Sequence, residues 1–337
     1  MGLMRLLPRH PRPAHDTGTP SGPGRDPVAL EHETADHELA ALERALDLPD
    51  AAPPRSGAAP ASGSVPAVNA ASAAPAVTKI IVLANQKGGV AKTTTTLNLG
   101  VALREMGHRV LLVDLDPQGN LTMSQGMNPD VIETSMFDVL VRRIPISEVI
   151  HTIEVDLAVS SIDLAGAELA LASLIGRERA LEKALLEVRG KYDYVLIDTP
   201  PSLGLLTINA FVVSTGVIVP VQCEYLSLRG LVQLENTLAM VRENLNPEVA
   251  VMGIVPTMYD GRTLHSREAI EILEENFGDL VYKTRIRKTV RYAEAPVKGS
   301  SVLRYDPAGS AAEAYRQLAR EIVAKEGERG TQSREHA

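Results

Sequence analysis

The sequence predicts an α/β domain built on a doubly wound, mostly parallel sheet that is flanked by helices. Short runs rich in Val, Ile and Leu, which are typical of strands covered on both faces, alternate with longer stretches of helical periodicity. A glycine-rich turn joins the first of these runs to the first helical stretch. A chain of 337 residues, 45% of them hydrophobic, has room for one large or two modest domains with a buried core.

Six apolar runs are the predicted strands, and predicted helices separate most of them. The strands are residues 80–84, 110–113, 157–159, 194–197, 217–221 and 249–255. The helices are residues 92–106, 164–174, 177–189, 226–243, 267–276 and 311–325. Residues 77–325 are therefore expected to form one domain that binds its ligands at the carboxyl ends of the strands.

Both ends of the chain lie outside this pattern. Residues 1–76 are rich in Ala, Pro, Gly and Ser and lack sustained apolar periodicity, so we predict a disordered N-terminal extension. Within it, residues 28–48 carry leucines that can form a short amphipathic helix, either transient in a solvated tail or docked on a partner. Residues 326–337 are predicted to be a polar C-terminal tail.

Charge and cysteine content exclude several classes of protein. The net charge of −8 argues against a nucleic-acid surface that covers the whole molecule, although residues 283–304 carry a local net charge of +6. The single cysteine, Cys223, excludes a disulfide within the chain and a cluster held by several thiolates. No apolar run reaches the roughly 20 residues that span a bilayer. The protein is therefore expected to be cytoplasmic.

The turn after the first strand has the residue types that hold nucleotide phosphates. Backbone N–H groups of the loop and the N-terminus of the next helix attract phosphate, Lys92 neutralises its charge, and Thr93 can ligand Mg²⁺. A plain glycine turn would not explain two lysines flanking two glycines with paired threonines behind them. The nucleotide-binding loop consists of Lys87, Gly88, Gly89, Val90, Ala91, Lys92, Thr93 and Thr94.

Carboxylates follow two of the predicted strands. Asp114 and Asp116 come after the second strand, and Asp198 comes after the fourth. In a parallel sheet these side chains would emerge at the same edge as the phosphate loop. Carboxylates at that edge can hold Mg²⁺ or its hydration shell, and one of them can orient the water that attacks the γ-phosphate.

These residues resemble a known family. The loop at 87–94 looks like the deviant phosphate loop (deviant Walker A), with its extra leading lysine, of the ParA/MinD group of ATPases. The carboxylate segments at 114–120 and 198–202 resemble the ParA (Soj) branch. The similarity covers essentially residues 78–325 and continues through residues 220–231, 257–260 and 294–296.

The resemblance implies a P-loop ATPase that uses ATP and Mg²⁺ and forms a homodimer while ATP is bound. By position, Lys92 would hold the β- and γ-phosphates, and Thr93 would ligand the metal. Asp116 would orient the attacking water near the metal, while Asp114 and Asp198 organise the metal shell. The family fold is the same doubly wound sheet.

Two further loop residues carry expectations. Lys87 matches the signature lysine that reaches the nucleotide of the opposite subunit, so it joins the expected catalytic residues. Ala91 stands where the commonest form of the loop has glycine, and a methyl group there is expected to require an ordinary right-handed backbone. ATP binding is expected to persist because Gly88 and Gly89 remain, and hydrolysis is expected to be slow.

The basic stretch at residues 282–291 lies where the family carries DNA-contacting residues, although a solvated charge run is the plain alternative. Contacts to DNA phosphates would be independent of base sequence and sensitive to salt. The resemblance therefore implies a nucleoid-associated dimer on non-specific double-stranded DNA, with hydrolysis stimulated by a ParB-like centromere-binding protein. The expected DNA-binding residues are Arg262, Arg285, Arg287, Lys288 and Arg291.

Three other functions stay open. A MinD-like positioning ATPase at the membrane shares the loop, but residues 326–337 lack the apolar face of a membrane-targeting helix, so no stable membrane association is expected. A reductase iron protein needs paired thiolates, which Cys223 alone does not provide. A scaffold or repressor that has lost hydrolysis is the third. The cargo, whether chromosome, plasmid or another assembly, stays open as well.

Overall fold

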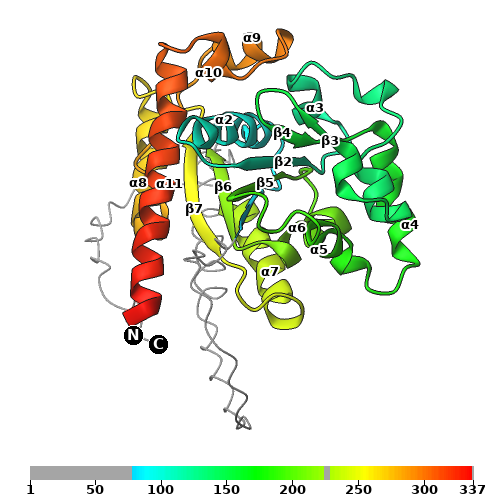
Figure 1. Ribbon diagram of the computed structural model, residues 1–337. Coiled ribbons are helices and arrows are strands. Elements are labelled where there is room, and N and C mark those ends of the chain that lie inside the picture. The colour runs from blue at the N-terminus through cyan, green and yellow to red at the C-terminus, as the bar shows by residue number, and fades with distance from the viewer. Residues whose placement is uncertain (1–77, 224–227, 336–337) are drawn as a thin grey trace, which may run out of the picture.

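The computed structural model describes residues 78–223 and 228–335. The predicted N-terminal extension and the predicted start of a helix at residue 226 lie outside these residues. The predicted architecture is confirmed: a seven-stranded sheet, parallel except at one edge, lies between two layers of helices (Figure 1).

The sheet has the strand order β3-β4-β2-β5-β1-β6-β7, and only β3 is antiparallel to its neighbour. The strands are β1 Lys79–Leu83, β2 Val110–Asp114, β3 Ile150–Thr152, β4 Asp156–Ala158, β5 Tyr194–Asp198, β6 Gly216–Gln222 and β7 Val251–Thr257. The first strand, β1, lies at the middle of the sheet, between β5 and β6. The carboxyl ends of β1, β2 and β5 therefore lie side by side, which is where ligands bind in open α/β sheets.

Helices cover both faces of this sheet. They are α2 Lys92–Glu105, α3 Asn120–Ser124, α4 Ala167–Ala172, α5 Ala180–Leu185, α6 Leu205–Val213, α7 Leu228–Asn244, α8 Leu264–Phe277, α9 Arg291–Val297, α10 Val302–Tyr305 and α11 Ser310–Glu335. Helices α2, α10 and α11 pack together on one face, whereas α6 and α7 lie on the other, next to α4 and α5 (Figure 1). Both faces of the central strands are thus buried, as their continuous apolar runs predict.

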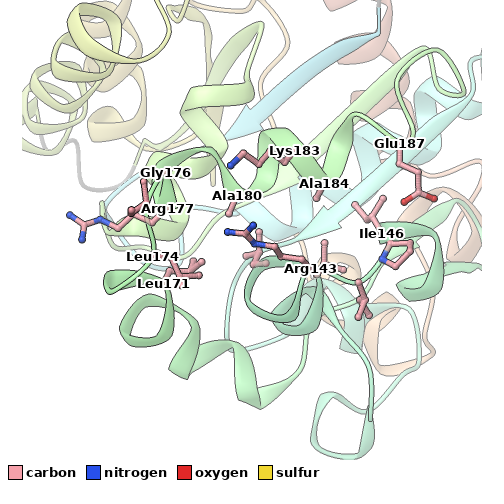
Figure 2. A pocket seen from close by; sticks show the side chains of 15 residues that line it. Arg143, Ile146, Leu171, Leu174, Gly176, Arg177, Ala180, Lys183, Ala184 and Glu187 are labelled. Carbon is pink, nitrogen blue, oxygen red and sulfur yellow. The ribbon is translucent and has the colours of Figure 1, made fainter.

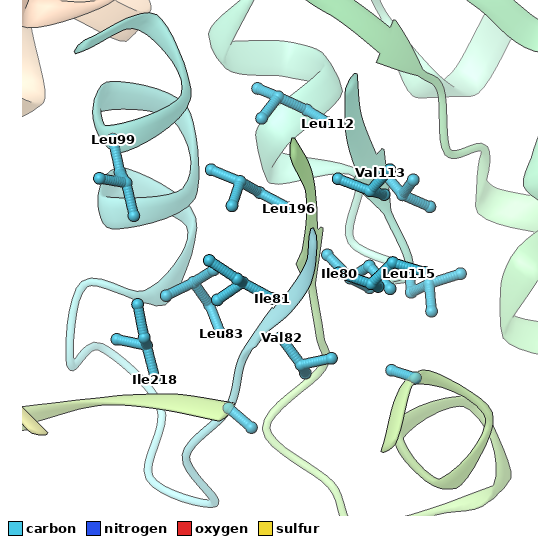
Figure 3. Packing of buried hydrophobic residues seen from close by; sticks show 14 of the residues in the cluster. Ile80, Ile81, Val82, Leu83, Leu99, Leu112, Val113, Leu115, Leu196 and Ile218 are labelled. Carbon is cyan, nitrogen blue, oxygen red and sulfur yellow. The ribbon is translucent and has the colours of Figure 1, made fainter. Parts of the chain in front are cut away.

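The core consists of aliphatic side chains that alternate between the two faces of the strands. Ile81 and Leu83 of β1 point toward α2, and Ile80 and Val82 point to the opposite face (Figure 3). Gly100 lets α2 approach the sheet closely, since a Cβ at this position would lie 2.6 Å from a leucine side chain of β2. Close packing of α2 holds its N-terminus at the carboxyl edge of the sheet.

Several element boundaries differ from the prediction. The predicted helices at 164–174 and 177–189 are the short helices α4 and α5, which follow 3₁₀ turns at Ile162–Gly166 and Arg177–Arg179. Between them Gly176 has φ +69°, a left-handed conformation that interrupts a helix. Helix α6 was missed because it is apolar almost throughout and shows no 3.6-residue alternation.

The last helix is longer than predicted and is part of the core. Helix α11 runs to Glu335, ten residues past the predicted end at 325, so the polar tail continues the helix. Its apolar residues Tyr315, Leu318 and Ile322 are fully buried, so this face of the helix packs on the core. Within the described residues, no helix is both long and apolar enough to cross a membrane.

Candidate functional site

The glycine-rich loop between β1 and α2 is anchored at both ends by neighbouring strands. Asn85 donates from Nδ2 to the carbonyl of Pro220 in β6 at 2.8 Å, and its Oδ1 accepts from the N–H of Lys87 at 2.9 Å. At the other end, Thr257 of β7 donates from Oγ1 to the carbonyl of Val90 at 3.1 Å. These side chains, to which the sequence analysis assigned no role, hold the loop in an open curve.

The front of the loop is open. Gly88 and Gly89 are exposed, and a Cβ built at either position meets no atom within 4 Å. Gly89 has φ +74°, a conformation that a side chain would strain. The loop therefore presents exposed backbone at a helix N-terminus, which is the arrangement that binds phosphate.

The expectation for the Ala91 backbone was wrong. Ala91 has φ 68° and ψ 33°, in the left-handed region, and it caps α2 by accepting the first helical hydrogen bond from Thr95 N at 2.9 Å. The chain must reverse from the loop into the helix at this residue, and the left-handed conformation makes that turn. For alanine it costs roughly 1–2 kcal/mol relative to a right-handed residue.

Replacing Ala91 with glycine should therefore stabilise the protein. Relief of the left-handed strain outweighs the extra chain entropy that glycine loses, for a net gain of about 0.5–1 kcal/mol in the free energy of unfolding. Equilibrium denaturation in urea measures this change. Ala91→Val is the matched control and should destabilise, since a β-branched side chain tolerates this conformation least. A less stable glycine variant would contradict the strain argument.

Lys92 places a buried cation behind the loop. Only 7% of its surface is exposed, and its Nζ donates to the carbonyl of Lys87 at 3.4 Å. Burial lowers the pKa of Lys92, while the negative charges of Asp198 and Asp116 act in the opposite direction. The ammonium group is thus short of partners for its charge in the free protein, and a phosphate in the loop supplies one.

Asp114 and Asp198 sit directly opposite each other at the ends of β2 and β5. Asp114 is fully buried and accepts two hydrogen bonds from Thr122, at 2.7 Å from Oγ1 and 2.9 Å from the backbone N–H. Burial raises the pKa of Asp114 to about 7, with these hydrogen bonds opposing the shift. Asp114 therefore holds the start of α3 in place through these hydrogen bonds.

Asp198 has one oxygen to spare. Its Oδ1 accepts from the Thr96 hydroxyl at 3.3 Å, whereas Oδ2 is buried with no hydrogen-bond partner among the described residues. Burial and the charge of Asp114 raise the pKa of Asp198 to about 8. The Thr93 side chain lies within reach of the same carboxyl group and opposes this shift in pKa. An unsatisfied buried carboxylate oxygen there fits Mg²⁺, which takes hard oxygen ligands.

Among the residues that the structure describes, few side chains are placed to ligand a metal ion. The described residues contain no group of three or more His, Cys, Asp or Glu side chains that could hold a metal ion. Mg²⁺ bound with a nucleotide uses one or two carboxylates together with phosphates and water, so this sparse set is sufficient.

Asp116 is held by its backbone, so its side chain is available for chemistry. Its N–H donates to Asp114 Oδ1 at 3.2 Å, and its carbonyl accepts from the Ser160 hydroxyl at 2.9 Å. Asp116 is 7% exposed, and its carboxylate accepts a hydrogen bond from Gln118 N at 3.0 Å. It lies close enough to Lys92 to affect the pKa of that lysine. The predicted loop and carboxylates therefore meet in one place.

Four of the five predicted DNA-binding residues gather beside β7. Backbone hydrogen bonds pair Tyr259 with the segment from Ile286 to Lys288, so this basic segment runs along the edge of the sheet. Arg285 lies over the Tyr259 ring, 5.2 Å from its centre, and forms an ion pair with Glu274 at 3.0 Å.

Arg262 and Arg287 meet at Asp260 in the same group. Arg262, 90% exposed, forms a two-pronged ion pair with Asp260, and hydrogen bonds from Arg262 lower the pKa of that carboxyl to about 2, with the charge of Arg287 adding to the shift. Several of the predicted cations are therefore already neutralised in part, which the sequence did not indicate.

Arg291 lies apart from this group, at the start of α9. It pairs with Glu294 at 2.8 Å and with Asp306 at 3.6 Å, and its guanidinium lies 6.0 Å from the centre of the Tyr305 ring. Helix α9 also packs against α3, which begins just after Asp116. Helix α3, which follows the phosphate site, is thus in contact with the helix that carries the predicted DNA-binding residue Arg291.

A glycine loop between the first strand and a helix, with carboxylates at the ends of two neighbouring parallel strands, defines a P-loop nucleoside triphosphatase. Comparison with known proteins narrows this class. Residues 78–251 match the AAA domain family. The chain belongs to this family and, within it, to the ParA/Soj chromosome-partitioning ATPases.

Two curated relatives carry the assignment. The sporulation initiation inhibitor protein Soj of Bacillus subtilis is 47% identical over 249 residues, which is 73% of this chain and 98% of Soj. The chromosome partitioning protein ParA of Caulobacter vibrioides is 43% identical over 256 residues, covering 74% of this chain and 96% of that protein.

Solved structures agree in fold. A Mycobacterium smegmatis protein described as cobyrinic acid a,c-diamide synthase, with bound ATP analogue and magnesium, has a TM-score of 0.65 at 41% identity, covering 73% of this chain and 95% of that one. The septum site-determining protein MinD of Pyrococcus horikoshii, complexed with Mg-ADP, has a TM-score of 0.59 at 27% identity, covering 73% and 96%.

Proposed function

We propose that the chain is a DNA-partitioning ATPase whose ATP-bound homodimer holds non-specific double-stranded DNA. A ParB-like centromere-binding partner stimulates its hydrolysis of ATP. The observation that carries this proposal is the buried Lys92, which lies behind an open phosphate loop near Asp116 and Asp198. The similarity to Soj, which extends over 98% of the length of Soj, supports it.

ATP and Mg²⁺ are the cofactors of the proposed activity. Bound Mg²⁺ neutralises phosphate charge and so lowers the barrier to attack by water. Thr93 and the unpartnered Oδ2 of Asp198 are the oxygens that hold the metal, and Lys92 holds the β- and γ-phosphates. Asp116 orients the attacking water, since its carboxylate lies near Lys92 and accepts one local hydrogen bond, from Gln118 N. The ATP analogue and magnesium bound to the M. smegmatis protein support this assignment.

Lys87 is the residue on which the proposed dimer depends. It stands at the outer lip of the loop, next to the exposed glycines, with its backbone N–H held by Asn85. A cation at this lip can reach the γ-phosphate held by a second copy. Such a contact exists only with ATP bound, so it favours the dimer in that state alone.

Sedimentation velocity tests the proposal. We expect a dimer in saturating non-hydrolysable ATP analogue with Mg²⁺, and a monomer with ADP. Single subunits in both nucleotides would overturn the dimer and with it the proposed switch.

Charge reversal at Arg291 is expected to reduce ATP-dependent DNA retention at least about tenfold, because the dimer carries this residue twice and each phosphate contact adds to binding. Arg291→Glu is measured by retention on long double-stranded DNA at several salt concentrations. Arg109→Glu is the matched control, since Arg109 is likewise an exposed arginine in an ion pair, with Asp193, at the start of β2. Equal retention by both variants would remove Arg291 from the interface.

The partner is tested by turnover. We expect the slow hydrolysis of ATP to rise when DNA and a ParB-like protein are added together. A rate that neither addition changes would favour a scaffold or repressor with the same fold.

A further inference from the structure

A cavity of about 240 Å³ lies outside the phosphate site, between α4, α5 and the π-helical turn Asp138–Arg142 (Figure 2). Neither the phosphate loop nor the three site carboxylates line it. The proposed ATPase cycle does not use this cavity, so its role needs a separate explanation.

The cavity has an apolar floor and an apolar rim. Leu140, Ile146 and Leu171 form its floor and are buried. At its rim Leu174 is partly buried, and Ile175 is 96% exposed. Ile175 and the leucines below it thus give a ligand an apolar surface to pack against.

The same cavity is basic. Arg143, Arg177 and Lys183 line it against one acid, Glu187, which already accepts a hydrogen bond from Ser147 (Figure 2). In the described part of the chain, Arg143 and Lys183 form no ion pair. The cavity therefore suits a ligand that is apolar on one side and acidic beside it.

We propose that this cavity is the docking site for residues 28–48 of the same chain. That segment has six acids and a single arginine, a net charge of −5 with histidine neutral. Read as a helix, Leu39, Leu42 and Leu46 share one face, and Asp36, Glu43 and Asp47 run along its flank. The leucines fill the apolar floor, and the acids pair with Arg143 and Lys183.

The chain enters the domain close to the cavity. The backbone N–H of Gly190 donates to Thr78 Oγ1 at 2.9 Å, and Glu187, three residues before Gly190, lines the cavity. The linker of residues 49–77 has, as a coil, a root-mean-square span of about 30 Å. Tethering at that range gives an effective concentration on the order of millimolar, so a weak contact within one chain is populated.

Cross-linking in the full-length protein tests this docking. The only native cysteine, Cys223, is buried. One cysteine replaces Ala41, which lies between Leu39 and Leu42 in the sequence. A second replaces Ile175 at the cavity rim or, as the matched control, Val297, which is 83% exposed on α9. With a short bis-maleimide we expect the pair at 41 and 175 to join within one chain at least about ten times faster than the pair at 41 and 297.

Charge variants show whether the electrostatic match matters. Arg143→Glu with Lys183→Glu should slow the cross-link at least about tenfold, and adding Glu43→Lys with Asp47→Lys should restore it. Lys191→Glu, an exposed lysine outside the cavity, should leave the rate unchanged. Glu43→Lys with Asp47→Lys in the otherwise unchanged protein should slow the cross-link as well. These two positions lie outside the described domain, so this variant reports on docking even where the cavity variant unfolds.

Three results would overturn the proposal. They are equal rates for the two cysteine pairs, cross-links that join two chains rather than one, and a cross-linking rate that charge reversal leaves unchanged. In the last case, weakened DNA retention by the Arg143→Glu, Lys183→Glu variant would assign the cavity to DNA phosphates instead.

Discussion

Replacing Lys92 with alanine is expected to weaken ATP binding at least about 100-fold. The ammonium group is buried between the phosphate loop and two aspartates, so a bound phosphate would lose its cation where water cannot compensate. Leaving a charge buried and unpaired costs about 2–5 kcal/mol, and each 1.4 kcal/mol is about tenfold in affinity. Calorimetric titration with ATP and Mg²⁺ measures the loss directly.

The matched control is Lys191→Ala, which removes an exposed lysine far from the loop in sequence. It should bind ATP like the unchanged protein. Thermal unfolding without nucleotide checks that the Lys92 variant is folded, since only its affinity for ATP should fall. Unchanged affinity in the folded variant would show that the phosphates do not lie against Lys92.

Replacing Asp116 with alanine is expected to slow hydrolysis at least about 100-fold while ATP binding persists. Positioned proton acceptors contribute roughly 10²–10⁴ to a rate, whereas Asp116 holds the fold mainly through its backbone. Only the hydrogen bond from Gln118 N to the side chain is lost. Phosphate release under single-turnover conditions measures the rate, and titration measures the affinity.

Asp116→Asn separates the two roles of this residue. It keeps an oxygen that can accept from Gln118 N but has no charge to take up a proton, so it should hydrolyse ATP as slowly as the alanine variant. Both variants are expected to remain dimers in ATP, because the γ-phosphate stays intact. Normal turnover in either one would move the catalytic role to another group.

The phosphate site was predictable because its parts are local in sequence. The run from Lys87 to Thr94 is one continuous segment that leads from a turn into a helix, and Asp114 and Asp198 each end an apolar strand. Parallel strands place their carboxyl ends at one edge, so recognising the strands is enough to bring these carboxylates together. The pairing of Asp114 with Asp198 across β2 and β5 follows from that rule.

The supports of the site were not predictable in the same way. Asn85 and Thr257 hold the loop through partners 135 and 167 residues away. Such partners depend on which strands become neighbours. The backbone of Ala91 was misjudged because alanine prefers the right-handed region, while the turn into α2 demands the left-handed one. The tertiary structure therefore determines the backbone conformation of Ala91, against the intrinsic preference of alanine.

The basic residues show the same division between composition and contact. Their abundance at 282–291 is evident from the chain. That Arg262 is paired with Asp260, Arg285 with Glu274 and Arg291 with Glu294 emerges only from the folded molecule. DNA phosphates would have to compete with these carboxylates, so the strength of the surface is lower than a count of cations indicates.

Local chemistry in the chain thus specifies the class of the domain, its phosphate loop and the carboxylates at its edge, because strand periodicity and loop composition are short-range properties. Folding alone specifies the strain at Ala91, the spare oxygen of Asp198 and the basic cavity beside α5. These features arise where segments distant in the chain are packed together. The sequence of a short segment does not specify which distant residues will contact it in the folded protein.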